Sequence, residues 1–175
     1  MKLLAYAASY HSTSINKALV TYAASLVPNA EVQLLDLNDF TLPLYTQDVE
    51  ARDGIPEAAQ RFYDLIGGAD ALAVSFAEHN GSYTAAYKNL YDWASRIDSK
   101  VFQGKPIVIM ATSPGPRGGK GVLGAAEASL PFFGAELKGS LSVPRFQNVF
   151  DRDAGRLTDD ELDAQLRALM GTLTA

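Results

Sequence analysis

A short polar segment follows the first apolar run of the chain and carries several groups that bind anions. It reads Ser9-Tyr10-His11-Ser12-Thr13-Ser14-Ile15-Asn16 and stands at the start of a helical pattern. The free N–H groups and the dipole of a helix N-terminus attract phosphate, and hydroxyl groups add neutral donors. Helix capping by one Ser or Thr is the alternative explanation. Four hydroxyls together with His11 and Asn16 favour phosphate binding.

A second polar segment, Ala77-Glu78-His79-Asn80-Gly81-Ser82, follows another apolar run. Asn80-Gly81 is a turn signal, and Ser82 is able to cap a following helix. Taken alone, this segment is compatible with an ordinary turn. Both histidines of the chain, His11 and His79, fall in these two segments.

A third segment is rich in glycine and reads Ser113-Pro114-Gly115-Pro116-Arg117-Gly118-Gly119-Lys120-Gly121. Its four glycines let a backbone approach a flat ligand closely. The segment is not a P-loop, because Pro114 stands where the first Gly of GxxxxGK[ST] belongs and Gly121 follows Lys120. The chain contains neither GxGxxG nor GxSxG, which disfavours a dinucleotide-binding Rossmann site and a nucleophile elbow.

These segments connect short apolar runs and helical patterns that alternate along the chain. Continuous apolar runs predict strands, and apolar residues at three- and four-residue spacing predict helices. The predicted strands cover residues 3–8, 32–37, 71–76, 106–111 and 137–143. The predicted helices cover residues 15–26, 58–66 (ended by Gly67 and Gly68), 83–94 and 123–130, and a last helix starts at Thr158 with Glu161 as a capping box. Residues 39–54 are predicted as a connection.

Strands that alternate with helices predict a parallel, doubly wound α/β sheet. No linker, repeat or low-complexity stretch divides the chain, so we expect one domain over residues 1–175. In open α/β sheets, ligands bind beyond the carboxyl ends of the strands at the topological switch point. The three unusual segments follow the first, third and fourth strands and should therefore meet at one edge of the sheet.

Composition excludes several other functions. The 175 residues include no Cys and only two His, which argues against disulfides, a thiol nucleophile and a metal site. The net charge of −5 does not favour binding to nucleic acid or an anionic membrane. The apolar run Leu3–Ala8 is shorter than the ~7–15 residues of a signal-peptide core, and no run approaches ~18 residues. We therefore expect a cytoplasmic protein.

Taken together, the three segments resemble the NADPH-dependent FMN reductase family, which includes quinone, azo and chromate reductases. The first matches the family pattern at Ser9, Ser14 and Asn16, with His11 where the family has Arg. The second matches Pro-Glu-Tyr-Asn-Gly-Ser with Ala77 and His79 as departures. Further matches are Tyr87–Ser95 (YKNLYDWAS), Leu42–Tyr45 (LPLY), Lys105-Pro106 and Ser113–Gly115 (SPG).

The resemblance implies a flavodoxin-like three-layer sandwich with strand order 2-1-3-4-5 and FMN at the switch point. By position in the family pattern, the phosphate would be held by Ser9, His11, Ser14, Ile15 and Asn16. The isoalloxazine would lie against Glu78, His79, Asn80 and Gly81 on one side and Ser113, Pro114 and Gly115 on its other polar edge.

The implied function is an FMN-dependent NAD(P)H oxidoreductase that passes hydride to a quinone, a flavin or a similar small acceptor. The cofactor carries the chemistry, so we assign no catalytic side chain and no metal. The family also implies a homodimer or homotetramer, and Tyr83, Tyr87, Tyr91 and Trp93 belong either to that interface or to the core. Two alternatives are a flavodoxin-type electron carrier and a family member that has lost flavin, the latter suggested by Ala8, His11 and Ala77.

Overall fold

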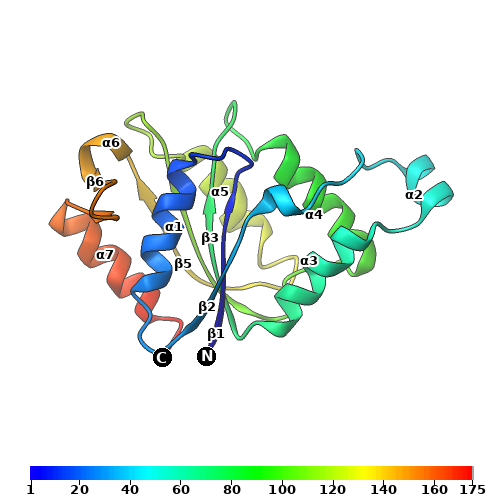
Figure 1. The fold of residues 1–175 in the computed structure, drawn as a ribbon, viewed down its shortest axis with the longest axis horizontal. Coiled ribbons are helices and arrows are strands. Elements are labelled where there is room, and N and C mark those ends of the chain that lie inside the picture. Colours follow the sequence, from blue (N-terminus) through cyan, green and yellow to red (C-terminus); the bar gives the residue numbers. More distant parts are fainter. Residues whose placement is uncertain (175) are drawn as a thin grey trace.

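A five-stranded parallel sheet forms the centre of the protein in a computed structural model that describes residues 1–174 (Figure 1). The strands are β1 (Lys2–Ala8), β2 (Glu31–Leu35), β3 (Ala71–Phe76), β4 (Pro106–Thr112) and β5 (Glu136–Val143). Their order is β2-β1-β3-β4-β5, and each neighbouring pair is parallel. The predicted flavodoxin-like order is therefore confirmed.

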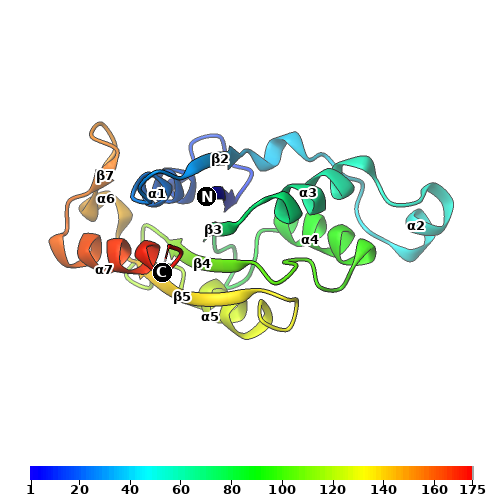
Figure 2. The ribbon, with the colours of Figure 1, turned by 90° about the horizontal axis from the view of Figure 1, so that it is seen from below.

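Helices cover both faces of this sheet and give three layers (Figure 2). One face carries α1 (Ile15–Ser25), α6 (Phe146–Val149) and α7 (Asp160–Gly171), whose side chains share a core with Leu3, Ala5 and Ala7. The other face carries α3 (Glu57–Gly68), α4 (Ala85–Ile97) and α5 (Lys120–Ser129), which share a core with Leu4, Tyr6 and Ala8. The alternation of β1 side chains between two cores explains its unbroken apolar sequence.

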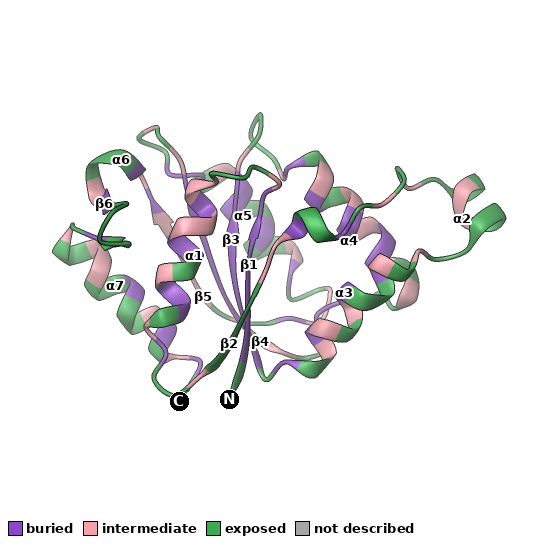
Figure 3. Cartoon of the chain, viewed as in Figure 1, coloured by how far each residue is buried: buried purple, intermediate pink, exposed green. Residues whose placement is uncertain are grey.

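The three central strands are buried, whereas the edge strands β2 and β5 are partly exposed (Figure 3). Every residue of β3 is buried, as are Leu3–Ala8 of β1. In β2, by contrast, the side chains of Val32 and Leu34 are 38% and 47% exposed. Burial therefore concentrates around the strands whose carboxyl ends carry the polar segments.

The observed helices differ from the predicted ones mainly at their ends. Gly67 and Gly68 are the last two residues of α3, so the helix ends with them as predicted, whereas α5 begins at Lys120 rather than at residue 123. The predicted capping box at Thr158 is wrong, because Asp159 caps α7 by accepting a hydrogen bond from Leu162 N. Thr158 N instead donates to Val149 O.

Several short elements lie outside the predicted set. They are a 3-10 turn (Leu37–Asp39), α2 (Gln47–Asp53), α6 and an antiparallel hairpin of β6 (Phe150–Asp151) with β7 (Arg156–Leu157). No residue of α2 is buried, so it has no apolar face from which a helix could be predicted.

The aromatic residues of α4 and the turn before it belong mostly to the core. Tyr87 and Trp93 are 2% and 0% exposed, and Trp93 Nε1 donates to Pro43 O over 2.8 Å. Tyr83 and Tyr91 are half-buried and pack against Tyr87, with ring centroids 5.5 and 6.1 Å from it. Among residues 1–174, no helix combines the length and apolarity needed to cross a bilayer.

Candidate active site

The polar segments that follow β1, β3 and β4 meet around a cavity of about 260 Å³. Nine of the twelve predicted site residues line it: Ser9, His11, Ser14, Ile15, Asn16, Glu78, His79, Ser113 and Pro114. The lining also includes Thr13, Ala77 and Thr112, which sequence reasoning did not assign. Each of these three residues is next in sequence to a predicted site residue, and this adjacency could have placed them in the predicted site.

The amino end of α1 supplies hydrogen-bond donors to this cavity. The first N–H groups of a helix have no partner within it. Ser14 caps α1, and its Oγ accepts from Lys17 N over 3.3 Å. This bond uses the third amide of the helix and leaves those of Ile15 and Asn16 for a ligand. Both residues line the cavity, so the helix end and the hydroxyls form one donor-rich surface.

His11 adds a further donor in its neutral form. Its Nδ1 accepts a hydrogen bond from Thr13 N over 3.2 Å. A backbone N–H can only donate, so Nδ1 carries no proton in this arrangement and the ring proton lies on Nε2. Protonating the ring would remove the acceptor that Thr13 N uses.

Asn16 is buried behind the cavity and holds its walls together. Its side chain is 3% exposed, with Oδ1 accepting from Ser75 Oγ over 2.7 Å and from Thr112 N over 3.1 Å. Its Nδ2 donates to Thr112 O over 3.2 Å. These bonds connect α1 to β3 and β4. The side chain therefore positions the amino end of α1, and the group of Asn16 that is left for a ligand is its backbone N–H.

Glu78 is likewise committed to another segment of the protein. Its Oε2 accepts from Val122 N, in the first turn of α5, over 2.8 Å. Gly119, the residue before α5, has no side chain that could cap the helix, so Glu78 does this from across the site. A Cβ at Gly121 would lie 2.6 Å from Oε2, so only glycine lets the carboxylate approach.

The remaining predicted residues shape the turns that border the cavity. Asn80 and Gly81 have left-handed backbone angles, with φ of 53° and 78°, and both are exposed. They form the tip of a turn closed by hydrogen bonds between His79 and Ser82. Gly115 accepts through its backbone O from Ser113 Oγ and from Arg145 N. These three residues do not line the cavity itself.

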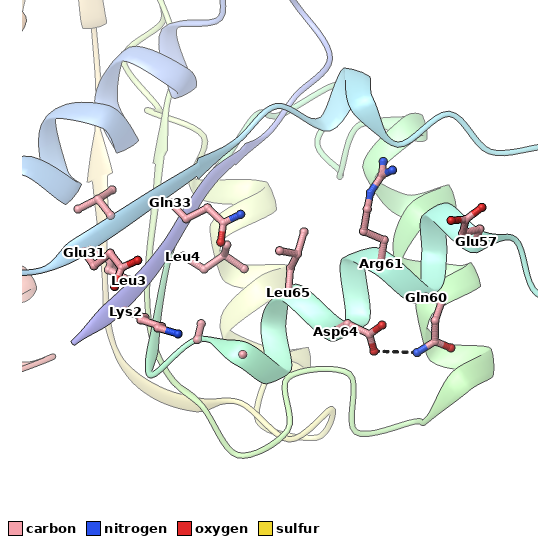
Figure 4. A pocket seen from close by; sticks show the side chains of 13 residues that line it. Lys2, Leu3, Leu4, Glu31, Gln33, Glu57, Gln60, Arg61, Asp64 and Leu65 are labelled. Atoms are coloured by element: carbon pink, nitrogen blue, oxygen red, sulfur yellow. Dashed lines mark hydrogen bonds between the residues drawn. The ribbon is translucent and has the colours of Figure 1, made fainter.

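A larger hollow of about 850 Å³ lies at the opposite end of the sheet (Figure 4). It is bordered by Lys2 and Leu4 of β1, Glu31 of β2 and Leu65 of α3. These strand residues stand at the amino ends of β1 and β2, whereas open α/β sheets bind ligands at the carboxyl ends. Gln60 and Asp64 on its wall bond to each other. The smaller cavity is therefore the candidate active site.

Charged and ionisable groups near the site are held by ordinary local contacts. Lys17 in α1 pairs with Asp36 over 2.6 Å, and this bond, together with two hydrogen bonds from Asn38, lowers the pKa of the Asp36 carboxyl to about 2. Burial raises the pKa of the Tyr10 hydroxyl to about 12. Tyr10 does not line the candidate cavity; it borders a separate hollow with Asn38 and Phe40.

Comparison with known proteins assigns the chain to a family. The family model for NADPH-dependent FMN reductase matches residues 1–148. An NAD(P)H-dependent FMN reductase of Pseudomonas aeruginosa is 36% identical over 97% of this chain and 93% of that protein. A quinone reductase of Escherichia coli K12 is 31% identical over 87% of this chain and 78% of that protein.

A solved structure supports the same assignment. The flavoenzyme NAD(P)H:(acceptor) oxidoreductase FerB of Paracoccus denitrificans superposes with a TM-score of 0.77 at 27% identity. The match covers 99% of this chain and 97% of that one. The predicted resemblance, enzyme class and FMN and NAD(P)H chemistry are confirmed by these findings. The chain belongs to the NADPH-dependent FMN reductase family.

Proposed function

We propose that the chain, as one FMN-binding domain over residues 1–175, oxidises NAD(P)H and reduces a quinone-type acceptor through FMN held in the 260 Å³ cavity. The observation that carries this proposal is the meeting of three donor-bearing segments at the carboxyl ends of β1, β3 and β4. The names of two relatives, an FMN reductase and a quinone reductase, support the acceptor class.

The residues present fit FMN on structural grounds. The phosphate would lie at the amino end of α1, against the amides of Ile15 and Asn16, the hydroxyls of Ser9 and Thr13, and His11 Nε2. The isoalloxazine would lie between His79 on one side and Ser113 and Pro114 on the other. The chemistry that FMN supplies when bound is acceptance and donation of hydride, so the protein supplies orientation and electrostatics.

The size of the cavity supports a second part of the proposal. Sites for small molecules usually measure about 300–1,000 Å³, and this cavity lies just below that range. One protomer therefore covers only part of a flavin, and we propose that a second copy covers the rest in a homodimer or homotetramer. Sedimentation of the FMN-loaded protein tests this, and a monomer at all concentrations would contradict it. We further propose a cytoplasmic location, where NAD(P)H is supplied.

A backbone substitution tests the phosphate site. Ile15 is the first residue of α1, a position that accepts proline, and Ser14 before it has φ −57° and ψ 127°, which proline also tolerates. Ile15→Pro thus removes one amide donor, whereas Ile15→Ala keeps it. Loss of one charge-assisted hydrogen bond should weaken FMN binding by about 10-fold or more in Ile15→Pro relative to Ile15→Ala. Riboflavin, which has no phosphate, should bind both variants equally.

Two measurements separate the alternatives. A protein without saturable FMN binding would be a family member that has lost flavin. A protein that binds FMN but does not oxidise NADH or NADPH in the presence of a quinone would be an electron carrier. Steady-state oxidation with parallel double-reciprocal lines would support the enzyme, because donor and acceptor would then use one face of the ring in turn.

A further inference from the structure

The strand β2 lies at one edge of the sheet and has no feature that prevents pairing with another strand. Unpaired N–H and C=O groups at a sheet edge attract other strands, and natural edges are protected by lysine, proline or a β-bulge. The opposite edge has such protection, because β5 contains Lys138 and a shift of register against β4. The sequence of β2, Glu-Val-Gln-Leu-Leu, has neither lysine nor proline, its register with β1 is regular, and residues 31–34 are exposed.

The free backbone groups of this edge belong to Val32 and Leu34. Glu31 N donates to Met1 O over 2.9 Å, so the backbone groups of Glu31 point toward β1. In a strand this direction alternates from one residue to the next, so the N–H and C=O groups of Val32 and Leu34 point away from β1. The same two residues also expose apolar side chains, at 38% and 47%.

We propose that β2 pairs antiparallel with β2 of a second copy of this chain, with a two-fold axis at Gln33. This register places Val32 opposite Leu34 of the second copy, and Leu34 opposite its Val32. The outward backbone groups of each facing pair then exchange both N–H···O bonds. The exposed apolar side chains meet on one face of the sheet, as the self-complementary surface of a two-fold interface requires.

Charged side chains on the other face complement each other in the same register. Glu31 of the second copy would lie opposite Leu35, which lines a hollow of about 530 Å³ between β2 and α3 together with Arg61. Arg61 and Gln33 also border the larger hollow beside it (Figure 4). Among the described residues, neither Glu31 nor Arg61 forms an ion pair. The pairing brings each Glu31 toward Arg61 of the other copy, on either side of the axis.

This interface lies apart from the candidate active site, which is at the carboxyl ends of β1, β3 and β4. It also differs from the contact proposed above, in which a second copy covers the flavin. The β2 pairing therefore goes beyond the proposed function, does not rest on it and needs no flavin. A protein that has both two-fold interfaces forms a closed homotetramer rather than a homodimer.

Cysteine cross-linking of the flavin-free protein tests the register. The chain has no Cys, so Gln33→Cys and Glu31→Cys each introduce a single exposed thiol. Across the axis, the Cα atoms of position 33 would lie about 4.5 Å apart, which a disulfide can bridge. Position 31 would lie about 14 Å from its copy, because about four residues of 3.4 Å separate them along the strands. We expect Gln33→Cys to form a covalent dimer about 10-fold faster than Glu31→Cys, since only position 33 meets its copy. Equal rates would overturn the pairing.

Charge substitutions at the axis test the pairing without a covalent bond. Gln33→Lys and Gln33→Glu each place like charges opposite each other, so each variant alone should have a dissociation constant about 5-fold higher than the wild type. In an equimolar mixture Lys faces Glu, and assembly should recover. Sedimentation velocity measures the assembly, and circular dichroism checks that the variants keep the fold. A wild type that is monomeric at every concentration, or a mixture that dissociates like the separate variants, would overturn the pairing.

Activity of the FMN-loaded protein separates this inference from the proposed function. Gln33 does not line the candidate cavity, so Gln33→Lys should bind FMN and oxidise NAD(P)H as the wild type does. If NAD(P)H is oxidised but wild type and Gln33→Lys sediment alike, the β2 pairing fails and the proposed function stands. If Gln33→Lys weakens assembly in a protein that oxidises no NAD(P)H, the pairing stands and the proposed function fails.

Discussion

The hydrogen bond between Glu78 and the amino end of α5 predicts that Gly121→Ala changes the free energy of unfolding in opposite directions in the presence and in the absence of Glu78. Glu78→Ala removes a charged acceptor from Val122 N, an amide of the first helical turn. Loss of a capping interaction costs about 0.5–2 kcal/mol, and a bond to a charged group contributes about 1.5–3 kcal/mol. Glu78 is only half-buried, so water replaces part of the bond, and we expect a loss of about 1–2 kcal/mol. For a chain of this length, Tm should fall by about 2–8 °C.

Gly121→Ala should act on the same bond from the other side. The new Cβ would lie 2.6 Å from Glu78 Oε2 and 3.3 Å from Cδ, so the carboxylate must move. Alanine in place of glycine within a helix gains about 0.5–1 kcal/mol, which offsets part of the lost bond. We expect a net loss of up to about 1 kcal/mol in the wild-type background. In the Glu78→Ala background the clash is gone, and the same substitution should stabilise by about 0.5–1 kcal/mol.

Urea unfolding of the wild type, the two single variants and the double variant measures whether the effect of Gly121→Ala on the free energy of unfolding changes sign when Glu78 is removed. Gly124 provides a matched control, because it lies in the same helix and a Cβ added there would have no neighbouring atom within 4 Å. Gly124→Ala should stabilise by about 0.5–1 kcal/mol in both backgrounds. If Gly121→Ala has the same sign with and without Glu78, the proposed contact does not hold the two segments together.

Three further predictions concern α1, the carboxylate that pairs with it and the segment that precedes it. Asn16→Leu removes the bonds that Asn16 makes with Ser75 Oγ and with the backbone N and O of Thr112. The free energy of unfolding, measured by urea denaturation, should therefore fall by about 3–5 kcal/mol. Asp36→Asn should cost less than ~1 kcal/mol at neutral pH, because the ion pair with Lys17 is solvent-screened. Because the pKa of Asp36 is lowered in the folded protein, the stability that its carboxylate contributes is complete above about pH 4 and is lost as the pH falls through about 2; below that pH, wild type and variant should be equally stable. His11→Arg should bind FMN more tightly than the wild type, because arginine always carries a charge; equal FMN affinity of the two proteins would exclude position 11 as a phosphate contact.

The parts of the fold that were predictable are those that bury apolar surface. The central strands stand out because β1, β3 and β4 are apolar on both faces, and α1 and α4 show helical spacing of their buried residues. The elements α2 and β6–β7 bury little or nothing, so apolar periodicity could not reveal them. At Thr158 the capping pattern was shifted by one residue, because the hairpin uses Thr158 N for a bond to Val149 O.

The candidate site was predictable in place but only partly in detail. Polar residues at the ends of three strands indicate where ligands would gather. The sequence cannot show that the side chains of Asn16 and Glu78 form hydrogen bonds with backbone groups 96 and 44 positions away. Both residues have the chemistry of ligands, and only the fold shows that they position other groups.

If the phosphate binds as proposed, these contacts explain how the site works with His11, where the resemblance predicts Arg. Asn16, Glu78 and Thr84 hold the walls of the cavity through backbone bonds, Thr84 by donating to Ala8 O over 3.2 Å. The donors left for a phosphate are mainly backbone amides of α1 and hydroxyls, and an amide is present whatever side chain its residue carries. Having His11 in place of Arg therefore removes one charged contact and leaves the amide and hydroxyl donors in place. Affinity for the phosphate should depend more on the three positioning side chains, which set the geometry of all the donors, than on the residue at position 11.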